Sequence, residues 1–156
     1  MKTILTSFSF LFLLTLNYSF APLSIAKDDD GVPPDFGSRE TTLLIMKLEK
    51  MNAQNKKISE IFSKYYKGKF KMIESLDESY ADTDKFGYVL MTRATFNPAS
   101  GMGATRMPAS WAYTGSIVDR VADKTYPVGY EGGAYGPFFK AYAKRIEKMR
   151  AKNSGQ

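Results

Sequence analysis

The side chains that most often perform catalysis are scarce in this sequence of 156 residues. It contains no histidine and no cysteine, which removes the Ser-His-Asp and Cys-His catalytic sets and the usual ligands of zinc. No phosphate-binding G-x-x-x-x-G-K-[ST] motif occurs. Gly101 and Gly103 are followed by Arg106 where a dinucleotide-binding motif needs a third glycine. The most common catalytic and nucleotide-binding chemistries are therefore not supported.

Acidic residues form two patterns that can be compared with known kinds of site. A calcium-loop pattern begins at Asp82, but Phe86 and Arg93 stand where the loop requires oxygen ligands. A carboxylate pair for glycosidic chemistry is offered by Glu74, Asp77 and Glu78. These three fall on one predicted helix, where a solvated acidic face is the simpler interpretation. The sequence therefore predicts a protein that is not an enzyme, with no catalytic residue, no metal and no cofactor.

Residues 1–26 have the pattern of a cleavable signal peptide. Lys2 supplies a positive start, and the apolar run 4–16 is shorter than the ~20 residues that span a bilayer. Pro22 follows the run, and Ser24-Ile25-Ala26 places small residues at a cleavage site. We expect an exported protein, located in the periplasm or on the cell surface, that begins at Lys27.

The exported part is predicted to divide into a flexible arm, 27–38, and a single helical domain, 39–152. The arm is acidic and contains glycine and two prolines. A heptad stripe then predicts a long helix ending near residue 66; it comprises Leu44, Leu48, Met51, Asn55, Ile58, Phe62 and Tyr65. Asn55 occupies a position that can fix the register of a coiled coil. The alternative is that the stripe packs within one chain and Asn55 lies at its edge.

Shorter elements are predicted after this helix. A second stripe predicts a helix over 70–80, while the apolar run 86–96 is compatible with either a strand or a buried helix. Pro108 suits the first turn of a helix that carries Trp111, and Pro137 suits the start of a last helix. The expected fold is mainly α, a long N-terminal helix packed with shorter helices in a small bundle, with room for one short strand. The predicted core is Leu44, Leu48, Met51, Ile58, Phe62, Phe139, Tyr142 and Ile146.

Aromatic residues gather in and around a Tyr/Gly-rich loop at residues 125–136. Aromatic side chains on such loops are common at protein interfaces and in carbohydrate sites. The alternative is that they cover the core of a small domain. Together with the polar heptad position, they give the candidate binding residues, Tyr126, Tyr130, Tyr135, Trp111 and Asn55.

Positive charge is concentrated in two of the predicted helical regions. Residues 39–69 hold eight Lys or Arg against three Glu, and residues 140–152 hold six against one. Such regions suit an acidic partner or anionic lipid headgroups. Two ordinary solvated helix faces are the alternative. Nucleic acid is not expected as a partner of an exported protein, whereas peripheral contact with a membrane is compatible with the charge.

The layout of the chain resembles the minor pilin family of bacterial type IV secretion systems. The resemblance rests on the exported polar arm, the Lys/Asn/Gln-rich segment 47–68, the turn Gly101-Met102-Gly103 and the Pro-x-x-Trp step that ends at Trp111. It implies a mostly helical, non-enzymatic protein that acts in pilus assembly and in contact with a recipient or host cell. The implied partners are other secretion-system or pilus subunits and a cell-surface receptor. The alternative function is a periplasmic or secreted module that binds glycan or peptidoglycan through its aromatic loops.

Overall fold

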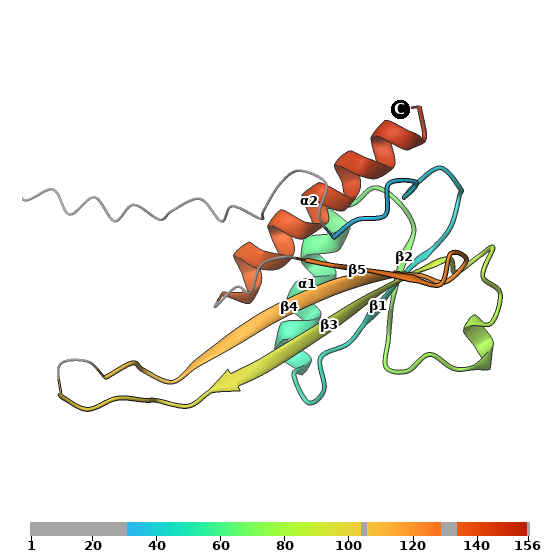
Figure 1. Cartoon of the computed structure of the whole chain (residues 1–156). Coiled ribbons are helices and arrows are strands. Elements are labelled where there is room, and N and C mark those ends of the chain that lie inside the picture. Colours follow the sequence, from blue (N-terminus) through green and yellow to red (C-terminus); the bar gives the residue numbers. More distant parts are fainter. Residues whose placement is uncertain (1–30, 104–105, 129–133, 156) are drawn as a thin grey trace, which may run out of the picture.

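The structure, a computed structural model, describes residues 31–103, 106–128 and 134–155. This part of the chain forms a five-stranded mixed sheet with two α-helices packed on one face (Figure 1). The elements are β1 (Leu43–Met46), α1 (Asn52–Tyr65), β2 (Phe70–Ile73), a 3-10 turn η1 (Glu78–Tyr80), β3 (Tyr88–Asn97), β4 (Ser110–Asp119), β5 (Lys124–Pro127) and α2 (Tyr135–Asn153). The strand order is β2-β1-β3-β4-β5, in which β1 pairs parallel to β2 and β3 and the other pairs are antiparallel.

The prediction of a mainly α helical bundle is wrong, and the first error lies in the long N-terminal helix. Its beginning is the strand β1, and the helix α1 starts only at Asn52. A central parallel strand is buried on both faces, so it has a continuous apolar run instead of an alternating pattern. The four residues Leu43–Met46 are such a run, and by chance Leu44 and Leu48 also fit a helical spacing.

The middle of the chain is also strand where helix was predicted. The region 70–80 contains β2 and η1, and the region after Pro108 forms β4, in which burial alternates along the strand. For the run 86–96, the strand alternative is confirmed by β3. The Tyr/Gly loop is shorter than predicted, because β5 occupies Lys124–Pro127. The last helix is confirmed and begins two residues before Pro137.

The core lies mainly between the helices and the sheet. All of the predicted core residues are buried except Met51, which is partly buried, and Leu44 lies on the opposite face of the sheet from the helices. Residues 1–26, predicted to be a signal peptide, and residues 27–30 of the predicted flexible arm lie outside the described residues. The described part of that arm supplies two core residues, Val32 and Phe36, each 1% exposed. On the face away from the helices, Tyr80 and Phe86 cover a smaller cluster formed with Leu44, Ile73 and Val89.

Candidate functional site

The strands β3 and β4 are much longer than their neighbours and form a ribbon that projects from the sheet (Figure 1). Each has ten residues, whereas β1 and β5 have four. On one side, β1 pairs with β3 only as far as Leu90, and on the other β5 pairs with β4 only from Ser116 onward. Residues 93–97 and 110–114, called the ribbon below, therefore form a two-stranded unit whose outer edges have no strand neighbour in the described chain.

The face of the ribbon that continues the helix-covered face of the sheet carries an exposed aromatic pair. Phe96 lies opposite Trp111 in the register, and their ring centroids are 5.2 Å apart. Phe96 is 52% exposed and Trp111 is 41% exposed. Farther along, Met102 and Met107 are also exposed. Single exposed apolar residues are common, but a contiguous group of them marks an interaction surface.

The outer edge of β3 offers backbone groups to a further strand. The N–H of Val128 donates to the carbonyl of Gly115, so the backbone of Gly115 faces away from β3. Thr92, which lies opposite Gly115, therefore forms a non-hydrogen-bonded pair with it. Hydrogen-bonded and non-hydrogen-bonded pairs alternate along an antiparallel ladder, so Ala94 and Phe96 are also in non-hydrogen-bonded pairs with β4. Both residues direct their N–H and C=O groups outward. An open edge of this kind is a template for strand addition.

A crevice of about 630 Å³ lies beside this edge, at the carboxyl end of β1. It is lined by the loop Lys47–Met51, by Thr92–Ala94 and by Trp111. In the strand order, the strand that follows β1 in the chain, β2, lies on one flank of the β1–β3 pair, and the strand that follows β3, β4, lies on the other flank. Open α/β sheets bind ligands outside the carboxyl ends of their strands. Lys50, in the lining loop, has a positive φ of 56°, which is strained backbone for a residue with a side chain.

The charged side chains of the crevice are mostly positive. Lys47 pairs with Glu74 at 3.0 Å, and Lys50 pairs with Glu49 at 3.5 Å. Both pairs are largely exposed, so they contribute little and can exchange for another anion. Arg93 makes no ion pair with the described part of the chain. The crevice is therefore complementary to an acidic ligand.

The structure separates the aromatic residues that the sequence analysis grouped together. Trp111 lies on a strand of the ribbon, not on a helix, and Tyr135 packs on Tyr113 at the start of α2. Tyr126 is half-buried on β5 and lies opposite Ile117 of β4. Ile117 is six residues along β4 from Trp111, so Tyr126 and Trp111 are separated by roughly 20 Å along the strand direction. Tyr130 lies outside the described residues. Phe96 was missed, and only the register of β3 against β4 reveals it.

Asn55 is buried, and its side chain organises the loop between β1 and α1. Its Oδ1 accepts from the N–H of Leu48 and its Nδ2 donates to the carbonyl of Leu48, both at 2.8 Å. The carboxamide of Asn55 therefore pairs with both backbone groups of Leu48, as a neighbouring strand would. This geometry gives Asn55 a structural role next to the crevice.

Replacing Asn55 with alanine is expected to lower the free energy of unfolding by about 1–3 kcal/mol, because two buried backbone groups lose their partner. Urea denaturation measures this difference. The control is Asn52→Ala, an exposed position three residues earlier in α1, which should change the stability by less than about 0.5 kcal/mol. Equal effects at both positions would contradict the role assigned to Asn55.

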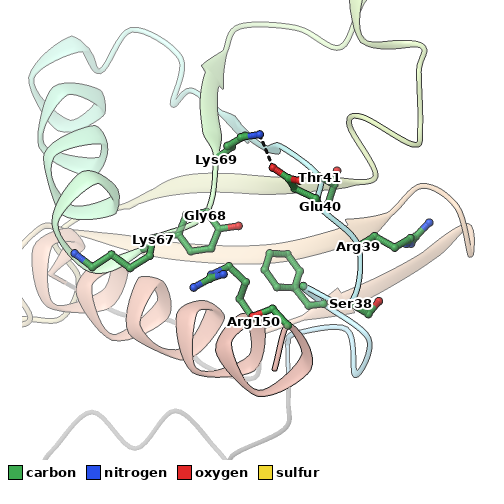
Figure 2. A pocket seen from close by; sticks show the side chains of 12 residues that line it. Ser38, Arg39, Glu40, Thr41, Lys67, Gly68, Lys69 and Arg150 are labelled. Carbon is green, nitrogen blue, oxygen red and sulfur yellow. Dashed lines mark hydrogen bonds and ion pairs between the residues drawn. The ribbon is translucent and has the colours of Figure 1, made fainter. Parts of the chain in front are cut away.

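A second, polar pocket of about 390 Å³ lies at the opposite, amino end of β1. It is lined by residues 36–41, residues 66–69 and the end of α2 (Figure 2). Lys69 pairs with Glu40 at the rim, and Arg150 enters from α2, where it binds Glu147 through two hydrogen bonds of 2.8 and 2.9 Å. Glu147 also accepts from the backbone N–H of Lys67. These contacts join three segments of the chain.

The pKa shifts in this pocket have local causes. The hydrogen bond from Arg150 holds the pKa of Glu147 below its usual value, and Lys69 lowers the pKa of Glu40 in the same way. Burial raises the pKa of Tyr66, so its hydroxyl stays protonated. Most cations here already have a carboxylate partner. Most positive charges of the pocket are therefore neutralised by a carboxylate within the chain.

Comparisons of the chain with protein-family models, with characterised proteins and with solved structures found no match. The fold and the sites define an α/β domain with a projecting β-ribbon. The resemblance to minor pilins implied a mostly helical fold, which the sheet contradicts. Membership of that family stays a prediction, and the function has to be argued from the geometry.

Proposed function

We propose that this is an exported, non-enzymatic binding protein that captures an extended, acidic polypeptide strand along the open edge of β3. The observation that carries the proposal is the combination of outward backbone groups at Ala94 and Phe96 with the exposed Phe96–Trp111 pair. Strand addition obtains affinity from main-chain hydrogen bonds and specificity from side chains on alternate positions. A place among pilus or secretion-system subunits, in contact with a cell-surface receptor, is one setting for such a protein.

The side chains around the edge favour a strand with alternating apolar and acidic residues. A strand added to β3 would place one set of its side chains against Phe96 and Trp111. The same strand would pass the crevice, where Lys47, Lys50 and Arg93 supply positive charge. Insertion of the ribbon into lipid is disfavoured, because its unpaired backbone groups would lose their water.

The experiment uses the fluorescence of Trp111, the single tryptophan of the chain. The probe is an eight-residue peptide that alternates valine and glutamate, compared with the same peptide carrying lysine in place of glutamate. We expect the acidic peptide to change the emission of Trp111 in a saturable way. The lysine peptide should bind at least ~10-fold more weakly, which corresponds to about 1.4 kcal/mol.

Two variants separate the backbone from the side-chain contribution. Ala94→Pro removes an outward N–H without breaking the β3–β4 ladder and should abolish binding. Phe96→Ser should weaken binding by at least ~10-fold while leaving the circular dichroism spectrum unchanged. The matched control is Val121→Ser, which removes another exposed apolar side chain, 49% exposed, from the turn between β4 and β5.

Unchanged peptide binding by a folded Ala94→Pro variant would contradict strand addition. A response of Trp111 to an N-acetylglucosamine tetramer, with none to either peptide, would favour the glycan-binding alternative instead. In that case the aromatic pair would act as a sugar platform and the open edge would have no part in binding.

A further inference from the structure

The two basic regions of the sequence meet on the outer side of the helix layer. The helices α1 and α2 pack against each other, which brings lysines of residues 57–64 next to lysines of residues 140–144. The lysine cluster, as we call it, consists of Lys57, Lys64, Lys140 and Lys144, and all four side chains are exposed. This surface is distinct from the ribbon, so the inference goes beyond the function proposed above.

A single aromatic ring organises the cluster. The ammonium nitrogens of Lys64, Lys140 and Lys144 lie 5.6, 5.5 and 5.3 Å from the ring centroid of Tyr65. Cation–π attraction favours each of these positions. The three ammonium groups are therefore no more than about 11 Å apart, which is close to the Debye length of about 8–10 Å in physiological salt. They repel one another and together attract anions.

Few acidic groups offset this positive charge. Glu60 pairs with Lys57 at 3.0 Å. Lys64, Lys140 and Lys144 make no ion pair with a carboxylate in the described ranges. Like charges held together without a counter-charge are more stable when an external anionic surface covers them.

A hollow of about 490 Å³ within the cluster has an apolar floor. Its floor is formed by the buried Ile61 and the half-buried Tyr65, and its rim carries Lys57, Glu60, Lys64 and Lys140. Gly136 and the exposed Pro137 complete the apolar part of the lining. An inorganic anion would use only the rim. A phospholipid uses both parts, because its phosphate meets the lysines while the apolar region beneath the headgroup meets the floor.

We infer that this face binds the surface of a membrane containing anionic phospholipids. The lysine cluster contacts the phosphates, and the ring of Tyr65 sits at headgroup depth, where amphipathic aromatic side chains are favoured. Binding is peripheral. Within the described residues, no helix combines the length and the apolar character that crossing a bilayer requires.

The test is co-sedimentation of the chain from Lys27 onward, the form expected after export, with vesicles of phosphatidylcholine and phosphatidylglycerol at a ratio of about 3:1. Pure phosphatidylcholine vesicles should bind at least ~10-fold less protein, since each lysine near an anionic surface adds to the attraction. Raising the salt to about 0.5 M should release the protein, because exposed charges are screened. Binding that is independent of lipid charge would overturn the inference.

Matched variants locate the contact. The triple change Lys64→Gln, Lys140→Gln and Lys144→Gln should lower vesicle binding by at least ~10-fold. The control triple, Lys69→Gln, Lys71→Gln and Lys85→Gln, removes equal charge from outside the cluster and should lower binding by less than about 3-fold. Equal losses in the two triples would overturn the inference, because net charge alone would then explain binding.

Further measurements test whether misfolding, a small-anion site or the ribbon explains the result. Changing the three cluster lysines to arginine keeps the charge and should preserve binding, which separates charge loss from misfolding. Displacement of the protein from vesicles by about 10 mM inorganic phosphate at constant ionic strength would identify a small-anion site and overturn the lipid assignment. The variant Phe96→Ser should bind vesicles normally, and its failure to do so would place the lipid contact on the ribbon.

Discussion

Replacing Phe62 with alanine is expected to lower the free energy of unfolding by about 3–5 kcal/mol, the range for removal of a buried phenylalanine. Phe62 is fully buried between α1 and the sheet, and its ring centroid lies 5.8 Å from that of Phe70 and 6.3 Å from that of Tyr66. Since small domains have a total stability of about 5–15 kcal/mol, urea denaturation should show a large shift of the midpoint.

The matched control is Phe96→Ala, which removes the same ring from the ribbon. Phe96 is half-exposed, so its loss should change the stability by less than about 1 kcal/mol. A similar large loss at both positions would show that the ribbon aromatics stabilise the fold, and it would contradict the binding role proposed for them.

Replacing Gly37 with alanine should cost about 2–5 kcal/mol, the sum of a left-handed backbone penalty and the crowding of a packed site. Gly37 has a φ of 88°, and a Cβ atom there would lie 2.5 Å from the Cα of Arg150. That contact is with the backbone of α2, so no side-chain rotation can relieve it. Thermal unfolding followed by circular dichroism should show the loss.

Gly103→Ala is the control that separates conformation from crowding. Gly103 also has a positive φ, 59°, but a Cβ atom there would have no neighbour within 4 Å among the described residues. Alanine at this position should cost only about 1–2 kcal/mol, the backbone penalty alone. If both substitutions had the same effect, the close packing of Gly37 on α2 would not matter for stability.

Local sequence patterns predicted the last helix and left a strand open for β3, but they predicted helix where β1, β2 and β4 form. The last helix has a clear stripe that includes Phe139, Tyr142 and Ile146, and the structure confirms it. The strand β1 has only four residues and lies between β2 and β3, so it has no polar face to reveal a period of two. Short apolar runs of this kind do not distinguish strand from helix.

The candidate binding surface depended on pairing that no local pattern contains. Trp111 was identified for its residue type but was assigned to a helix, and Phe96 was not identified. The two are fifteen residues apart and meet only because β3 and β4 pair in one register. The lysine cluster shows the opposite case. Both charged regions were visible in the sequence, and the packing of α1 on α2 then placed them on one surface.

The position of α2 after all five strands has a consequence for biogenesis. Phe138, Phe139, Tyr142 and Ile146 complete the core on the helix-covered face of the sheet, where α2 contacts β4. A chain that emerges with its N-terminus first therefore exposes that apolar face until α2 has appeared. Incomplete chains of this kind are prone to aggregate. We expect nascent or truncated forms that lack α2 to depend on a chaperone.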